Sequence, residues 1–119
     1  KLIYALGKNI RSGVTGLKIL DMTLKNSGGE AVRLRYFAHN NEIGNCTILN
    51  CGIYDFKFGG GGNVGDGICI GTDADQLSDG KNPTADPDQS NNNWIHHNII
   101  DTQGSECGDI KEGSYSNVM

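Results

Sequence analysis

The segment Asn41-Glu42-Ile43-Gly44-Asn45-Cys46-Thr47-Ile48-Leu49-Asn50 decides the fold, because related segments occur before and after it in the chain. Its opening recurs at Asn93-Trp94-Ile95, 52 residues further on, and again at Asn117-Val118-Met119, after a further 24 residues. Twenty-four residues before it, Leu17-Lys18-Ile19 fits the same pattern. A repeat of about 24 residues therefore places four apolar residues in one column: Ile19, Ile43, Ile95 and Met119.

The same spacing aligns the residues that follow each opening. Met22-Thr23-Leu24 matches Cys46-Thr47-Ile48 and Asn98-Ile99-Ile100. Next come a polar column of Asn26, Asn50 and Thr102 and a glycine column at 28, 52 and 104. Apolar residues at alternate positions within short runs have the period of a strand. We therefore predict an all-β solenoid, a right-handed parallel β-helix, in which asparagines stacked about 4.8 Å apart hydrogen-bond along the stack.

One coil of the predicted solenoid is longer than the others. The interval of 52 residues is one repeat of 24 plus 28 extra residues, which include Gly59-Gly60-Gly61-Gly62 and a Gly-, Pro-, Asp- and Asn-rich run at 73–92. We expect a loop at about 73–92. Two strands compete for this coil: the gapless repeat favours Phe56-Lys57-Phe58, whereas the acidic residue before the strand favours Ile68-Cys69-Ile70. The sequence leaves both registers open.

Residues 1–119 are expected to form a single, partial β-helix domain. A new coil begins at Asn117, and neither end of the sequence has the pattern of a solenoid cap. An uncapped solenoid leaves strand edges and apolar surface bare. We therefore expect a piece of a longer solenoid, with a tendency to self-associate end to end.

Composition and charge indicate which binding partners and which cellular location to expect. The net charge is −4, which argues against nucleic acid, and no apolar run reaches the length of a membrane span. Four cysteines permit disulfides in a secreted protein and contain no C-x-x-C pair for zinc. Together with the glycosylation sequon Asn45-Cys46-Thr47, they favour an extracellular location.

The strand pattern also predicts which charged side chains face outward. With Val32 and Leu34 inward, Arg33 and Arg35 point out, and the matching coil presents Asp109 and Lys111. Either register then places a glycine, Gly59 or Gly71, between Arg35 and Lys111. The result is a notch between two cations about 9–10 Å apart, twice the coil spacing, which could hold a sugar ring.

This pattern fits the chemistry of uronate-polymer lyases. Removal of the C5 proton builds charge on the neighbouring carboxylate, which arginine, lysine or a metal ion must stabilise. We expect Lys111 to be the base, with its pKa lowered by nearby cations, and Arg33, Arg35 and Asp109 to contact the substrate.

Possible metal ligands lie at the corners before the strands. Asp66 and Glu106, and also Glu30, could cap backbone amides or bind Ca²⁺, although calcium requires about 6–8 oxygen ligands. The acidic residues Asp73, Asp75 and Asp79 do not match an EF-hand and indicate a solvated loop. His96 and His97 are neighbours on a strand, so we expect their side chains to face opposite sides and not to form one metal pair.

Two segments resemble right-handed parallel β-helix repeat proteins of the pectate-lyase-like superfamily. They are Gly65-Asp66-Gly67-Ile68-Cys69-Ile70-Gly71-Thr72 and Glu106-Cys107-Gly108-Asp109-Ile110-Lys111-Glu112-Gly113, and the resemblance extends from about Gly13 onward. In the chondroitinase-B-like branch, a lysine is the base and an acidic calcium ligand closely precedes it, a spacing similar to that of Glu106 and Lys111. This sequence departs from that branch in having Ile-Lys-Glu-Gly around the lysine and fewer acidic neighbours.

The resemblance implies a secreted carbohydrate-active protein that acts on an acidic polysaccharide by β-elimination, and the cofactor it implies is Ca²⁺. Two other functions remain open at this point. A uronate C5-epimerase shares the proton abstraction but returns the proton. A non-catalytic glycan-binding or structural solenoid would use the same cations only to hold the polymer.

Overall fold

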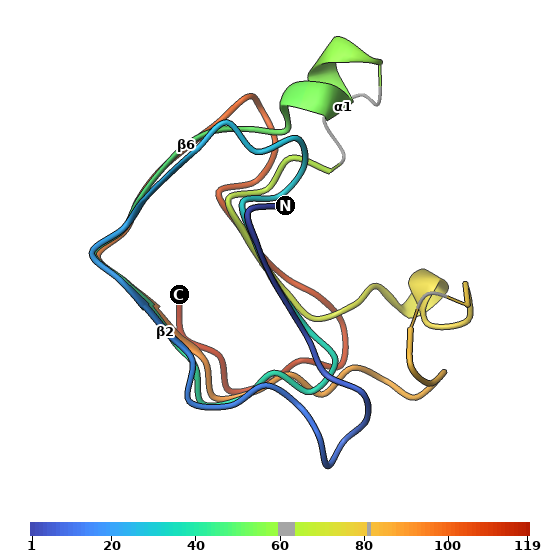
Figure 1. Ribbon diagram of the computed structural model, residues 1–119. Coiled ribbons are helices and arrows are strands. Elements are labelled where there is room, and N and C mark those ends of the chain that lie inside the picture. Colours follow the sequence, from blue (N-terminus) through green and yellow to red (C-terminus); the bar gives the residue numbers. More distant parts are fainter. Residues whose placement is uncertain (60–63, 81) are drawn as a thin grey trace.

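The computed structural model describes residues 1–59, 64–80 and 82–119, and within them ten short strands pair in parallel into three sheets (Figure 1). Sheet I contains, in spatial order, β1 (Ile3–Leu6), β4 (Val32–Arg35), β7 (Ile68–Ile70) and β10 (Gly108–Ile110). Sheet II contains β2 (Lys18–Leu20), β5 (Glu42–Gly44) and β8 (Trp94–His96). Sheet III contains β3 (Thr23–Lys25), β6 (Thr47–Cys51) and β9 (Ile99–Thr102). Each full coil adds one strand to each sheet, so the chain is an all-β parallel β-helix, as predicted.

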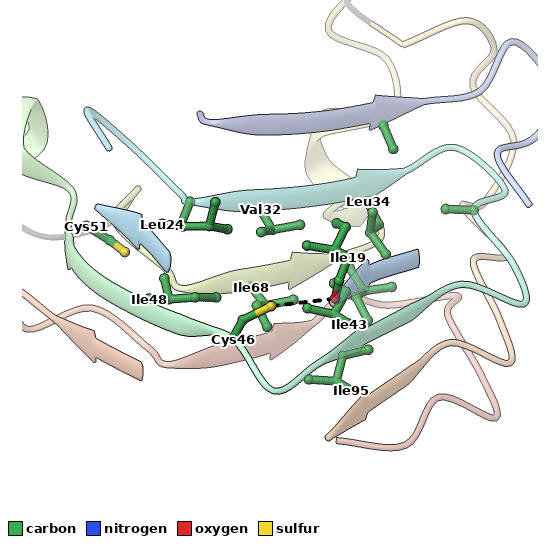
Figure 2. Packing of buried hydrophobic residues seen from close by; sticks show 14 residues of the cluster. Ile19, Leu24, Val32, Leu34, Ile43, Cys46, Ile48, Cys51, Ile68 and Ile95 are labelled. Carbon is green, nitrogen blue, oxygen red and sulfur yellow. Dashed lines mark hydrogen bonds between the residues drawn. The ribbon is translucent and has the colours of Figure 1, made fainter. Parts of the chain in front are cut away.

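The core is a narrow apolar stripe enclosed by the three sheets (Figure 2). In sheet II, Ile43 pairs with both Ile19 and Ile95, and all three side chains are buried, which confirms three members of the predicted column. The fourth, Met119, is exposed. In sheet III, Ile48 pairs with Leu24 on one side and with Ile100 on the other. Because each fully buried aliphatic side chain contributes about 1.5–3 kcal/mol, these short columns hold the coils together.

The structure resolves the competition between the two possible strands of the long coil. Ile68 pairs with Val32 on one side and with Gly108 on the other, so β7 is the strand that follows the acidic residue. The competing Phe56 belongs to a short helix, α1 (Ile53–Lys57), which projects from the corner after β6 (Figure 1). The gapless register is therefore wrong, because this helix is inserted before the strand. Residues 60–62 of the glycine run lie outside the described residues.

Residues with a left-handed backbone mark the bends between sheets. Asp21, Asn45 and His97 repeat at the spacing of the coils and have φ values of 56°, 54° and 53°. A second set also repeats at this spacing, with φ between 51° and 72°: Gly16, Asn40, Asn92 and Ser116. Asparagine, aspartate and glycine tolerate this conformation better than most residues, which explains their recurrence at corners.

A buried ladder of asparagines joins successive coils. Asn41 donates from Nδ2 to Oδ1 of Asn93 over 2.9 Å, and Asn93 donates in the same way to Asn117 over 2.8 Å. The same Oδ1 atoms accept backbone N–H bonds from Asn41 and Asn93, at 3.1 and 3.0 Å. Asparagine amides thus stack before β5 and β8, in a column other than the predicted polar column, whereas Leu17 occupies this position before β2.

The predicted polar column of Asn26, Asn50 and Thr102 is only partly correct. Asn50 donates to Asn26 Oδ1 over 2.8 Å, but a shift of register in β6 pairs Cys51, rather than Asn50, with Thr102. Gln103 takes the expected position of Thr102 and hydrogen-bonds to Asn50. The added residue in β6 is a bulge, which a repeat alignment without gaps cannot anticipate.

The region expected to form a loop, at about 73–92, leaves the coils and returns to them. A one-turn 3-10 helix, η1 (Ala74–Gln76), opens an excursion away from the coils (Figure 1), and Lys81 lies outside the described residues. The chain has rejoined the stack by Asn91, which forms bridges with His39 and Tyr115. The buried carboxylate of Asp88 fixes the point of return.

The cysteines do not form disulfides with one another. All four are free; Cys46, Cys51 and Cys69 are buried and Cys107 is exposed. The possibility of disulfides is therefore not realised, and three of the thiols act as small buried side chains. Among the described helices, none is long and apolar enough to cross a membrane.

Candidate functional site

A cavity of about 290 Å³ opens on the outer face of sheet I. We call it the sheet I cavity. Its lining combines cationic, anionic and amide side chains and includes four of the expected site residues, Arg33, Arg35, Asp66 and Lys111. The remaining lining residues are Lys1, Glu30, Val64, Asp73, Gln76 and Asp79. Asp109 adjoins this group through Lys111, and Glu106 through Asp66.

Arg35 and Lys111 lie on the same face of sheet I with Gly71 between them, as predicted. The Gly71 N–H donates to Leu34, and the Lys111 N–H donates to Ile70, both over 2.8 Å, which continues the strand register to the notch. A Cβ on Gly71 would clash with Oγ of Ser114 and lie 3.3 Å from Cβ of Lys111, so this close packing requires glycine. We call the part of the sheet I cavity between Arg35 and Lys111 the Arg35–Lys111 notch.

Arg35 is held in place by neutral groups. Its Nε donates to Oγ1 of Thr72 over 3.1 Å, and its Nη2 donates to Oδ1 of Asn82. The Thr72 hydroxyl in turn donates to Asp88 over 2.8 Å, which ties the arginine to the anchor of the long loop. Among the described residues, no carboxylate forms an ion pair with Arg35 within 4.0 Å, so its charge is available to a ligand.

Lys111 is held between two carboxylates. Its Nζ lies 2.5 Å from Asp109 Oδ2 and 3.2 Å from Asp73 Oδ1. Partial burial would lower the pKa of Lys111, but hydrogen bonds and charge attraction from Asp109 and Asp73 raise it above its usual value. The expectation that cations lower the pKa of Lys111 is therefore wrong, because its immediate neighbours are anions.

Arg33 projects from the outer face of sheet I but is buried, with only 4% of its surface exposed. Its Nη1 donates to Glu30 Oε1 and to Cys69 Sγ, and its Nη2 donates to the Gly71 carbonyl, each over 2.9 Å. Within the described part of the chain, Nε has no partner. The expectation of an exposed guanidinium is wrong, and much of the hydrogen-bonding capacity of Arg33 is already used inside the protein.

Glu30 is the main ionic partner of Arg33. Its second oxygen, Oε2, lies 3.0 Å from Nζ of Lys1. Burial alone would raise the pKa of Glu30, but Lys1 and Arg33 together hold it below its usual value. The carboxyl group is therefore charged at neutral pH, and this ion pair forms part of the cavity wall.

Asp66 and Glu106 are neighbouring acidic residues at the corner before β7 and β10. Burial raises the pKa of Asp66, and contact with Glu106 raises it further, against the hydrogen bond that Ser105 Oγ donates over 2.6 Å. The pKa of Glu106 is lowered by its own backbone N–H and then by Ser105 and Asp66. Asp66 is thus the member of the pair that holds a proton more readily.

Among the described residues, one group of side chains comes near the geometry of a metal site. Donor atoms of Asp66, Cys69 and Asp109 lie within 4.8 Å of one another, which makes them the nearest approach to one. However, burial raises the pKa of the Cys69 thiol to about 12 despite the nearby Arg33, so the sulfur is a neutral and soft donor. Calcium requires about 6–8 oxygen ligands, and Lys111 already neutralises Asp109.

Sequence reasoning did not identify several residues of this site. Cys69 occupies the outward column between Arg33 and Asp109, and the correct register would have revealed it. Asp73 and Asn82 reach the cavity from the long loop, which has no repeat to place it.

The two adjacent histidines also differ from expectation. Nδ1 of His96 and Nδ1 of His97 lie 2.9 Å apart, so the rings meet instead of facing opposite sides. The strand rule fails because His97 occupies a left-handed bend, with φ of 53°. The signal was present in the sequence, since His97 shares its column with Asp21 and Asn45.

Searches of protein-family models, curated proteins and solved structures find no match to this chain.

Proposed function

We propose that this chain is part of a secreted carbohydrate-active protein of the pectate-lyase-like kind, and that it binds an acidic polysaccharide across the Arg35–Lys111 notch. The proposal rests on the absence of an acidic partner for Arg35 among the described residues. Its described partners, Thr72 and Asn82, are neutral, and it stands beside a glycine at a cavity large enough for part of a sugar ring. A guanidinium with a free edge is well suited to bind a carboxylate with two hydrogen bonds.

Lys111 supports the same proposal as a second positive charge. Asp109 and Asp73 keep it protonated at neutral pH, so it can attract a uronate carboxylate but does not release a proton readily. The surrounding acidic residues limit binding to polymers whose carboxylates reach the notch itself. The site therefore favours binding over catalysis in the state described here.

Affinity electrophoresis through polygalacturonate or alginate tests this proposal. Arg35→Gln should weaken retardation at least tenfold, because glutamine can still contact Thr72 but carries no charge. Lys25→Gln, on the exposed face of sheet III, is the matched control and should bind as the wild type does. Retardation of the wild type should fall with added salt. Equal retardation by a neutral polymer such as pullulan, or no effect of Arg35→Gln, would overturn the proposal that Arg35 binds a polymer carboxylate.

Cleavage of the polymer by β-elimination is the second candidate function, favoured by the position of Lys111 beside Arg35 in one cavity. A carboxylate bound to Arg35 would bring the adjacent C5 proton toward Nζ of Lys111. For Lys111 to accept that proton, it must first be neutral. Since its pKa is raised, the neutral fraction at pH 7 is small and should increase about tenfold per pH unit.

Lys111→Arg separates binding from elimination. Arginine keeps the positive charge but cannot act as a base, so this variant should still bind the polymer and should lose any ultraviolet absorbance from unsaturated uronate. The logarithm of the wild-type elimination rate should increase with pH at a slope of about one between pH 7 and pH 9. A flat profile, or full activity in Lys111→Arg, would exclude lysine as the base. Deuterium exchange at C5 without absorbance would instead indicate an epimerase.

A further inference from the structure

We propose that His96 and His97 form a bidentate binding site for a divalent copper- or nickel-class ion on the outer face of sheet II. This site is separate from the sheet I cavity and does not depend on the proposed function. Both ligands would be Nδ1 atoms, which lie 2.9 Å apart. The ion would replace the proton shared between these nitrogens, and that proton would move to Nε2 of the His97 ring.

Glu42 prepares His96 to be a ligand. Its Oε1 lies 3.0 Å from Nε2 of His96, and hydrogen bonding to His96 is the main reason that the pKa of Glu42 is lowered. A carboxylate at Nε2 favours the tautomer with the proton on that nitrogen, which leaves a lone pair on Nδ1. The same carboxylate–histidine arrangement orients histidine ligands in many metal sites.

The surrounding structure holds the His96 ring in one orientation. The ring stacks on Trp94 at a centroid distance of 3.8 Å and lies over Gly44, where a Cβ would come within 2.5 Å of it. Glu42 is further fixed by Lys18, whose Nζ lies 3.4 Å from Oε2. One of the two ligands is therefore preorganised before an ion binds.

Access and geometry together indicate the class of ion. His97 is exposed, and both histidines help to line a cavity of about 170 Å³, so an ion with its bound waters can approach this pair. With metal–nitrogen bonds of about 2.0 Å, a 2.9 Å separation corresponds to an angle of about 90° at the ion. Tetragonal Cu²⁺ and Ni²⁺ favour this angle, whereas tetrahedral Zn²⁺ requires a separation of about 3.3 Å.

Titration of the chain with Cu²⁺, followed by electron paramagnetic resonance, tests the proposal. The Cys107→Ser background removes the exposed thiol, which would otherwise reduce the ion. We expect one equivalent to bind with an axial spectrum showing coupling to two nitrogens. His97→Asn should weaken binding at least tenfold and lose one nitrogen, while keeping the bend, because asparagine occupies the same column at position 45.

Two further variants separate the site from general effects of histidine. His39→Thr removes the third histidine of the chain and should not change binding. Threonine is suitable at this position because Thr15, the bridge partner of His39, has the same side chain. Glu42→Leu should weaken binding about 10–100-fold, because the proton of His96 is then no longer held on Nε2. Glu42→Gln should keep most of the affinity, because its side-chain oxygen can still accept from Nε2. Equal affinity and spectra for the wild type and His97→Asn would overturn the proposal. So would a loss of binding in His39→Thr as large as in His97→Asn.

Discussion

At the scale of single residues, the most constrained side chain is a carboxylate outside the expected site. Asp88 is fully buried and accepts backbone N–H bonds from Tyr36 and Phe37, at 2.9 and 3.2 Å, together with bonds from Thr72 and Ser90. Tyr36 and Phe37 are consecutive aromatic residues with φ of 57° and 59°, an uncommon conformation for such side chains. Asp88 therefore stabilises a strained bend and fixes the return of the long loop.

Replacement of this carboxylate should destabilise the chain strongly. Asp88→Ala leaves the buried N–H groups of Tyr36 and Phe37 without an acceptor, and we expect a loss of at least about 3 kcal/mol in the free energy of unfolding. Asp86→Ala, on the exposed part of the same loop, should change stability by less than about 0.5 kcal/mol. Urea denaturation monitored by circular dichroism measures both. Similar midpoints for the two variants would contradict the assigned role of Asp88.

Individual contacts also explain why the outward-facing side chain of Arg33 is buried. Alternation along β4 correctly placed its side chain on the outer face, but alternation does not report what else packs there. Glu30 and Cys69 occupy that space and hold the guanidinium. The main contact of Arg33 is therefore an internal ion pair, and removing Arg33 would leave the buried carboxylate of Glu30 with Lys1 as its described ionic partner.

At the scale of elements, the asparagine ladder joins the coils where sheet II begins. Asn93 makes the most contacts in the ladder, since it accepts from Asn41 and donates to Asn117 and to the carbonyl of Ala38. Its side chain is buried, so no water can replace these bonds. The ladder thus supplies directional bonds between strands that are only three residues long.

Neighbouring asparagines should therefore differ in their effect on stability. Asn93→Ala should reduce the free energy of unfolding by about 2–4 kcal/mol, because several buried polar groups lose their partners. Asn92→Gly should change it by less than about 0.5 kcal/mol, since the side chain is exposed and glycine readily adopts φ near 53°. Thermal melts of the two variants provide the comparison, and an equal loss in both would rule out a structural ladder.

At the scale of the whole molecule, the coils leave apolar core positions uncovered at the outer edge. Leu34 and Ile70 are fully buried, whereas Ile110 in the same column is 40% exposed. β10, which contains Ile110, is an outer strand of sheet I and presents unpaired backbone groups. Such an edge can pair with another chain.

We therefore expect the 119-residue chain to self-associate end to end as its concentration rises. Ile110→Lys should weaken association at least tenfold, because a lysine on an edge strand opposes pairing. Tyr54→Lys, on the exposed surface of α1, is a control for general hydrophobicity and should have little effect. Light scattering over a concentration series measures the change. A monomer at all concentrations, or an equal response to both variants, would contradict this mode of association.

The repeat, the polar and glycine residues at the corners of the coils, and most of the inward columns could be predicted from the sequence. These features are local: a strand alternates its faces, and asparagine, aspartate and glycine tolerate a left-handed backbone wherever the fold bends. The column of Ile19, Ile43 and Ile95 and the placement of Arg35 and Lys111 on one face follow from those rules alone, whereas the choice of Gly71 over Gly59 required the register of β7.

The insertions that interrupt the repeat, and the contacts between residues that the repeat does not relate, became known only from the folded structure. The choice of Ile68 over Phe56 depended on a helix inserted in one coil, and the proton affinity of Lys111 depended on Asp73, which comes from a loop without any period. The contact of His96 with His97 depended on a bend that turns one ring toward the other. Periodicity encodes the path of the backbone, whereas charge state and ligand geometry depend on distances between residues that the periodic pattern does not relate.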